Sequence, residues 1–587
     1  MAIRGLPKVL SRRMSSPPFH DRIPPPDSVL GRSSADSGRG NANGIPVMLT
    51  GTLLYGALVA VAVMRVWPHY ELFAIVLQVV LLLPALLYGL KGKEPGPRAQ
   101  LVPAGAGIWT AAVMGVFLIG SAVLSAINAQ GFSNADEMSY RFQARILGTG
   151  NLVAVPPPGA PQQPAAVPLP LRFNNLVLWR NGWFAKYPLG WPLVLALPEK
   201  IGLDWLANPL LAVGILICTA RIAGTIGGPG GAFCAVALLV LSPCFLAPSV
   251  ELMSHATAGL LVAWSCWAWL EGTRRKRLSC FALMYLLIGL AFHVRPLTAL
   301  LAAASLTGGV VLTLRREPGF LAQVLAIGAA FGALIVGSVL VYNRTFTGNL
   351  WLSPYAFARG VNVPVEIAAS VPQALQNMKQ MWRFSMQSTL LFFFPLIFAL
   401  AGVGFWKNRK TSPVVWLLLS LFLVIVLGHF VQTENSGSVL AERYWFEGYF
   451  AVAILAAQGI AAVVAALESP QRSLIAAGCS LLAVQLMVTI AASKIVLQAS
   501  APSRAVAHLA GQYRDCRCVV FLRSSPPFFA AEHLSLNGPD WQQAQVFYAV
   551  DPGPEQRMVW TRTLGRQRWV VVGYDPVAGR AQREEQP

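Results

Sequence analysis

The chain has 587 residues, of which 55% are hydrophobic and only 12% are charged, and its net charge is +20. Soluble domains carry about 25% charged residues, so repeated apolar stretches of about 20 residues indicate a polytopic helical membrane protein instead. Lys and Arg gather in short loops between these stretches, so the positive-inside rule explains the net charge and we expect no nucleic-acid partner.

The first 44 residues are rich in Ser, Pro, Gly and Arg, which predicts a disordered cytoplasmic tail and no signal peptide. About thirteen candidate spans follow, each near the length that a bilayer requires. They are 45–66, 70–90, 105–128, 207–226, 229–248, 252–271, 279–294, 296–314, 320–342, 388–406, 412–431, 444–467 and 472–496. We therefore expect an all-α polytopic membrane protein, with residues 45–104 as an N-terminal transmembrane hairpin.

Loop charges predict the orientation of the spans. Four short loops rich in Lys and Arg fall on one side under this count, which identifies that side as cytoplasmic. They are 91–98, 274–277, 315–317 and 407–410. Three long polar segments then lie outside, namely 129–206, 343–387 and 497–587. We expect a multi-pass protein of the cell membrane with a cytoplasmic N-terminus and an extracytoplasmic C-terminal region.

The segment 497–587 is long enough for one small domain. Three of its stretches are typical of short buried strands, which favours a small α/β unit outside the membrane. These stretches are 516–524, 543–550 and 568–576. Cys516 and Cys518 form a C-x-C pair without a second pair nearby, so they do not predict a zinc site.

An enzyme site outside the membrane cannot count on nucleotide-activated substrates and would normally use a lipid-linked donor. Such a donor is an anionic phosphate with a long apolar tail. Its site requires cations near the membrane surface, an apolar groove between helices and a carboxylate that deprotonates the acceptor.

The acidic pair Asp136–Glu137 follows the span 105–128 directly, in a chain with only 25 acidic residues. A carboxylate at this place suits a general base. The simpler alternative is that Ser133 or Asn134 caps a helix and that both acids favour the helix dipole.

The helix that begins at this pair is predicted to be amphipathic. Met138, Phe142, Ile146 and Leu147 share one face at helical spacing. Such a face suits a helix that lies on the membrane interface.

Lys186 and Tyr187 stand in "KYPLG", just before a predicted apolar segment. A Lys at the water–lipid boundary suits the phosphate of a lipid. The alternative is a Lys whose stem lies along apolar surface and whose ammonium reaches water within an aromatic belt.

His255 and Arg295 lie at the outer ends of two later spans, in "SHATAGLL" and "HVRPL". An Arg at the membrane boundary is costly and functional by default, and its guanidinium can hold a phosphate through two parallel hydrogen bonds. The alternatives are a hydrogen-bonded structural His and an ion pair between Arg295 and an acid such as Glu251.

Arg443 and Tyr444 stand at the outer start of another span, in "ERYWF". Arg443 is a second candidate for phosphate binding, with the same ion-pair alternative. The His, Cys, Asp and Glu residues are too scattered to predict a metal, and no motif predicts a cofactor.

Several stretches together resemble a known family. They are "NADEMSYRFQARILGTGNL", "KYPLGWPLVLAL", "LSPCFLAPSVELMSHATAGLL", "GLAFHVRPLTALL", "VYNRTFTGNLWLSPY" and "ERYWF". Their order is similar to that in bacterial membrane glycosyltransferases of the GT-C superfamily, in the protein mannosyltransferase and aminoarabinose transferase-like branch, glycosyltransferase family 39 and its relatives. The similarity covers roughly residues 105–465 and implies a GT-C-like catalytic domain over 105–496.

The resemblance implies transfer of a sugar from a polyprenyl-phosphate donor in the membrane lipid to an envelope acceptor. The base of that family maps onto Asp136, with Glu137 beside it in site organisation. A basic residue that binds donor phosphate maps onto Lys186. By position, we expect the remaining substrate-binding residues to be Tyr187, His255, Arg295, Arg443 and Tyr444.

Three features depart from the family pattern, one of which is the C-terminal segment 497–587, which has no counterpart in it. The hairpin 45–104 precedes the first matching span, and a Pro-rich insert at 155–172 interrupts the expected catalytic loop. Two other functions stay open. A transporter or flippase for lipid-linked glycans predicts charges deep in the spans and matching halves, whereas a non-catalytic envelope scaffold would act through 497–587. The sequence specifies neither the sugar nor the acceptor.

Overall fold

The computed structural model describes residues 105–161, 167–179, 182–359, 394–430, 443–466, 489–490, 492–513, 515–524, 531–575 and 580–585, with the single positions 372, 375, 376 and 379. The predicted tail at 1–44 and hairpin at 45–104 lie outside these residues, as does most of the predicted span 472–496.

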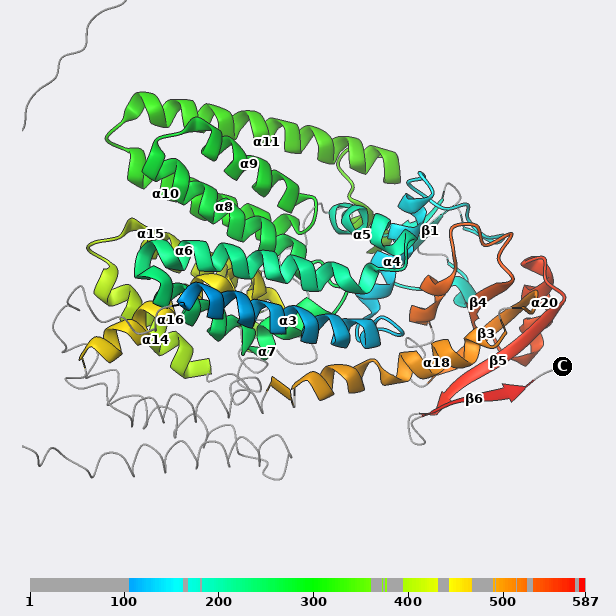
Figure 1. Ribbon diagram of the computed structural model, residues 1–587. Coiled ribbons are helices and arrows are strands. Elements are labelled where there is room, and N and C mark those ends of the chain that lie inside the picture. The colour runs from blue at the N-terminus through cyan, green and yellow to red at the C-terminus, as the bar shows by residue number, and fades with distance from the viewer. Residues whose placement is uncertain are drawn as a thin grey trace, which may run out of the picture. The chain divides into compact units, whose positions relative to one another are not determined.

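Apolar helices occupy the predicted spans of the described chain. They are α3 (Ala106–Asn128), α6 (Asp204–Val240), α7 (Pro243–Val250), α8 (His255–Arg275), α9 (Leu278–Phe292), α10 (Pro296–Leu314), α11 (Pro318–Thr347), α14 (Phe394–Asn408), α15 (Pro413–His429) and α16 (Phe446–Ala466). Within the described residues, five helices are long and apolar enough to cross a membrane, or six if α7 and α8 form one bent span. Figure 1 shows α8 to α11 running beside one another.

Proline and glycine mark the helix boundaries. Pro296, Pro318 and Pro413 each stand in the first turn of a helix, where a missing backbone N–H costs nothing. Gly228 interrupts α6 with a φ of 65°, a left-handed conformation that glycine adopts readily. This break falls between the two predicted spans 207–226 and 229–248.

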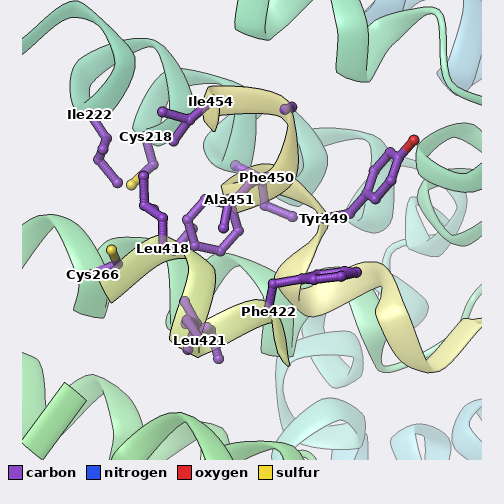
Figure 2. Close-up of a cluster of buried hydrophobic side chains, with 14 of the residues drawn as sticks. Cys218, Ile222, Cys266, Leu418, Leu421, Phe422, Tyr449, Phe450, Ala451 and Ile454 are labelled. Carbon is purple, nitrogen blue, oxygen red and sulfur yellow. The ribbon is translucent and has the colours of Figure 1, made fainter. Parts of the chain in front are cut away.

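A close-packed apolar core joins α6, α8, α15 and α16 (Figure 2). Phe450 of α16 and Leu418 of α15 are buried there beside Cys218 and Cys266, which are fully buried. The two cysteines thus act as small apolar side chains. In contrast, α11 leaves apolar residues such as Leu334 exposed, as expected for a helix that faces lipid.

The connection between α3 and α6 carries two helices and a hairpin. They are α4 (Ala135–Gly148), α5 (Gly190–Lys200), β1 (Leu176–Trp179) and β2 (Gly182–Ala185). β1 and β2 pair antiparallel, with Leu176 opposite Ala185 and Trp179 opposite Gly182. A short 3-10 turn, η2 (Leu169–Leu171), precedes the hairpin.

The C-terminal sheet has four strands in the order β4-β3-β5-β6 (Figure 1). The strands are β3 (Cys518–Ser524), β4 (Val546–Val550), β5 (Arg568–Asp575) and β6 (Arg580–Glu585). The helices of the same C-terminal region are α18 (Ala501–Gly511), η4 (His533–Leu536) and α20 (Pro554–Thr563). β3 pairs parallel with both β4 and β5, and β6 pairs antiparallel with β5. β3, β4 and β5 lie within the three stretches that the sequence analysis singled out.

The apolar face of α4 packs inside the protein, so the expectation that it lies on the membrane interface is wrong. Phe142 and Ile146 are fully buried, in one core with Trp183 of β2 and with Phe521 and Phe547 of the C-terminal sheet. An amphipathic pattern shows only that one face avoids water, and here protein covers that face.

Candidate active site

The acidic pair stands in the first turn of α4, after an asparagine cap. The Asn134 side chain accepts a hydrogen bond from the backbone N–H of Asp136 at 3.0 Å. Glu137 completes a capping box, since its Oε1 accepts from the backbone N–H of Asn134 at 2.9 Å. The capping alternative is therefore present in the fold, and Glu137 is the acid that serves it.

Glu137 is buried and surrounded by hydrogen-bond donors. Its Oε1 accepts from the N–H and the hydroxyl of Ser133, at 2.9 and 2.7 Å. Its Oε2 accepts from the Asn128 amide at 3.1 Å and from the N–H of Leu252 at 2.9 Å. Burial raises the pKa of Glu137, and the hydrogen bonds from Ser133, Leu252 and Asn134 oppose that rise. This carboxyl joins the end of α3 to the chain before α8.

Asp136 has a different environment from its neighbour. Its Oδ1 accepts from the Tyr187 hydroxyl at 2.6 Å and from the Asn175 amide at 3.0 Å. Its Oδ2 lies 3.4 Å from an Nη of Arg443. The carboxylate is thereby oriented by two neutral donors and one cation, and Oδ2 retains lone pairs for another proton.

Two tyrosines beside Asp136 stay protonated over the ordinary pH range. Burial, followed by the charge of Asp136, raises the pKa of Tyr140 to about 12 and holds that of Tyr187 well above its usual value. Their ring centroids lie 4.8 Å apart, and the Tyr140 hydroxyl is 3.2 Å from that of Ser254. Tyr187 is thus a hydrogen-bond donor to Asp136 and not a competing base.

The predicted cations gather around aromatic rings. The guanidinium carbons of Arg295 and Arg443 lie 5.4 and 5.3 Å from the centroid of the Tyr444 ring. The ammonium of Lys186 lies 5.4 Å from the centroid of Tyr187 and 4.7 Å from that of Tyr355. The ion pair Asp136–Arg443 and the hydrogen bond Asp136–Tyr187 connect these two groups.

A second carboxylate holds His255 and Arg295. Oε1 of Glu447, near the start of α16, is 2.9 Å from Nδ1 of His255 and 2.9 Å from Nε of Arg295. Arg295 therefore pairs with Glu447 rather than with Glu251, the acid that the sequence analysis offered. A carboxylate within an apolar span costs free energy and indicates a functional site. Glu447 could therefore have been predicted from the sequence.

Two motifs that are separate in the sequence meet at one contact. The backbone N–H of Gly190, in "KYPLG", donates to the carbonyl of His293, in "HVRP", at 2.8 Å. A Cβ at Gly190 would lie 2.7 Å from the carbonyl carbon of His293, so a larger residue does not fit. This contact holds the chain that carries Lys186 and Tyr187 beside the chain that carries Arg295.

The C-terminal sheet brings one more carboxyl close to the acidic pair. Glu532 precedes η4, and its pKa is raised to about 8 by burial and then by the charges of Asp136 and Glu137. Each of the eight residues predicted for the site contacts another of the eight or a residue that does so. Asn175, Glu447 and Glu532 are additions that the structure supplies.

Comparison with known proteins gives one family match, to the dolichyl-phosphate-mannose-protein mannosyltransferase model, over residues 205–342. No curated protein matches the sequence. One similar solved structure is ArnT from Cupriavidus metallidurans bound to undecaprenyl phosphate, which is 13% identical with a TM-score of 0.45 and covers 81% of this chain and 94% of that one. Another is the Archaeoglobus fulgidus oligosaccharyltransferase tethered with an acceptor peptide, at 10% identity and a TM-score of 0.46, covering 79% and 69%.

The match agrees with the resemblance to membrane glycosyltransferases of the GT-C class, and it covers less than half of the chain. Within the class, the matched model is that of protein mannosyltransferases, as the resemblance indicated. The matched residues include His255 and Arg295 but lie after Asp136 and Lys186.

Proposed function

We propose that the protein transfers a sugar from a polyprenyl-phosphate donor to an envelope acceptor on the extracytoplasmic face, with Asp136 as general base. The observation that carries this proposal is the Asp136 carboxylate, held by Tyr187 and Asn175 and facing Arg443 at 3.4 Å. A carboxylate that can take the acceptor's proton and a cation that can hold the donor phosphate thus lie in one site.

The transfer is a single displacement. As an acceptor hydroxyl oxygen attacks the anomeric carbon, its proton passes to Oδ2 of Asp136. The bond between that carbon and the phosphate oxygen breaks, its electron pair stays on the phosphate, and the anomeric configuration inverts. Arg443 and Lys186 stabilise the negative charge of the departing polyprenyl phosphate.

The remaining residues of the site position the proposed base and the phosphate-binding cations. Glu447 orients Arg295 and His255 through contacts of 2.9 Å, which keeps a further guanidinium on the donor side. The Tyr444 ring contacts the guanidinium groups of both Arg295 and Arg443. Glu137 keeps the first turn of α4 in place beneath Asp136.

The proposed orientation rests on the loop charges. The basic loops 274–277, 315–317 and 407–410 follow α8, α10 and α14, whereas Asp136, Arg295 and Arg443 stand at the opposite ends of their spans. This arrangement supports a multi-pass cell-membrane protein whose site and C-terminal sheet lie outside the cytoplasm.

The donor side can be tested with undecaprenyl phosphate and purified full-length protein. We expect Arg443→Ala to weaken its binding by about tenfold or more, because a charged hydrogen bond to phosphate is lost. Arg315→Ala, at an exposed arginine after α10, is the matched control and should bind as the wild type. Equal binding by Arg443→Ala would remove the phosphate role from this residue.

The reaction itself can be tested in cells that lack the gene. Envelope glycans compared by mass spectrometry should show one sugar modification that disappears with the gene and returns with the full-length protein. An unchanged glycan profile, together with altered transport of a lipid-linked glycan, would favour the flippase alternative instead.

A further inference from the structure

The turn that leads to Asp136 is in direct contact with α18, the helix that precedes the C-terminal sheet. The hydroxyl of Ser503 accepts from the backbone N–H of Phe132 at 2.6 Å, and its single proton is shared between the carbonyl of Phe132 at 2.7 Å and that of Ser500 at 2.9 Å. Ser503 is fully buried. One side chain thus binds both backbone polar groups of a residue that stands four positions before Asp136.

The fit between α18 and this turn depends on a glycine. A Cβ at Gly131 would lie 2.7 Å from the backbone nitrogen of Arg504, which cannot move aside as a flexible side chain could. The next residue, Phe132, is buried, and its ring centroid is 5.0 Å from that of His533. Backbone, glycine and ring contacts all bring the C-terminal sheet against the same turn.

The C-terminal end of α4 also contacts the C-terminal region of the chain. Nη1 of Arg145 lies 3.3 Å from the carbonyl oxygen of Ser535 in η4, while its Nε binds Glu199 of α5 at 2.7 Å. The C-terminal region therefore contacts the turn before α4 through α18 and the last turns of α4 through η4, so contacts on both sides of the helix hold it in place.

We propose that Ser503 is a positioning residue for the transfer reaction, through which the C-terminal sheet sets the place of Asp136 relative to Tyr187 and Arg443. The proposal rests on the function proposed above. The capping box of Glu137 fixes the shape of the turn, and Ser503 fixes its location. A base that is displaced by about 1 Å can lose about a hundredfold in rate, because proton transfer requires hydrogen-bond distance.

The test separates the rate of transfer from donor binding. In full-length protein, Ser503→Ala should lower transfer by about tenfold or more, while undecaprenyl phosphate still binds with an affinity within about twofold of wild type and with the same stoichiometry. Transfer is measured as the gene-dependent glycan in the deletion strain, normalised to the amount of protein in the membrane. Amide exchange at Phe132 should become faster in the variant.

Two further variants keep the result interpretable. Ser265→Ala removes a buried hydroxyl whose hydrogen bond, among the described residues, stays within its own helix at Leu261, and this variant should transfer at the wild-type rate. Ser503→Cys replaces the hydroxyl with a larger thiol that forms only weak hydrogen bonds, so its transfer rate should also fall below that of wild type.

The outcomes distinguish this proposal from the function on which it rests. Wild-type transfer by Ser503→Ala, when Asp136→Asn is inactive, would overturn the positioning role alone. Loss of undecaprenyl phosphate binding in parallel with transfer would show that Ser503 only maintains the fold, and would overturn it as well. Full activity of Asp136→Asn would instead refute the proposed function.

Discussion

Asp136 and Glu137 are adjacent carboxylates with different surroundings. Glu137 has donors at both oxygens and no room for a substrate proton, whereas Asp136 is held on one oxygen and faces Arg443 with the other. Their roles divide accordingly, with Glu137 stabilising the turn and Asp136 available for proton transfer. The same pair in a sequence cannot show this division, because both residues suit a helix N-terminus equally well.

Glu137→Gln should destabilise the fold. The glutamine amide would present N–H groups to donors such as Ser133 and Leu252, and unsatisfied buried donors cost about 1–3 kcal/mol. Denaturation of the purified protein measures the change. The control is Glu555→Gln at an exposed position of α20, and equal stability of both variants would contradict the structural role of Glu137.

Glu532 makes stability depend on pH. Its pKa of about 8 in the folded protein exceeds its ordinary value of 4.5, because of burial and the charges of Asp136 and Glu137. The folded state therefore retains a proton that the unfolded state releases, and stability falls as pH rises from about 4.5 to about 8. Glu532→Gln should have the melting temperature of wild type near pH 4.5. As the pH rises toward 8, the variant should melt at an increasingly higher temperature than wild type. Thermal unfolding at several pH values measures the difference. A constant difference across this window would contradict the shift.

The site residues that the sequence revealed are those with charged side chains at the membrane boundary, where burial of a charge costs free energy. Arg295 and Arg443 stand out because charges at the ends of apolar spans are rare, and the structure brings both to the Tyr444 ring. Asn175 was not predictable, since an asparagine in a polar loop is unremarkable. The ion-pair alternative for Arg295 named Glu251 as an example, and the structure shows such a pair with Glu447 instead, because the fold brings α16 alongside α8.

At the scale of elements, the apolar helices of the described residues were predictable and the packing of α4 was not. Runs of apolar residues longer than a strand allow only a helix, and Pro at the start of α10, α11 and α15 marks the boundary. The buried face of α4 required knowledge of residues about 400 positions further along the chain, which no local pattern contains. The strands β3, β4 and β5 were readable from their β-branched and aromatic runs.

Phe142 tests the packing of α4. Its ring lies in the core shared with Trp183 and the C-terminal sheet, with ring centroids 4.9 Å apart from Trp183. Phe142→Ala should cost about 3–5 kcal/mol of stability through lost burial and the cavity left behind. The control Leu152→Ala, at an exposed leucine of the same connection, should have little effect. If α4 instead lay on lipid, the two variants would unfold alike in detergent.

For the molecule as a whole, the C-terminal sheet is part of the same core as the chain around the site. Phe521 and Phe547 pack with Phe142, and the indole N–H of Trp541 donates to the carbonyl of Val155 at 3.0 Å. Removal of 497–587 would expose this core to water.

Truncation at residue 496 should therefore lower the amount of folded protein in the membrane, whichever function is correct. Size-exclusion chromatography of the solubilised protein measures the folded fraction. A monodisperse truncated protein with wild-type thermal stability would contradict the shared core. Because loss of folding is expected for a transferase and a scaffold alike, point variants rather than truncation must separate these functions.

The most direct measurement is glycan transfer by Asp136→Asn in cells that lack the chromosomal gene. Asparagine keeps the size of the side chain but cannot accept the acceptor's proton, so we predict loss of at least about a hundredfold in transfer, with normal membrane insertion and undecaprenyl phosphate binding. Asp540→Asn, at an exposed aspartate near the C-terminal sheet, should transfer normally. Wild-type glycan levels with Asp136→Asn would contradict the assignment of Asp136 as the catalytic base.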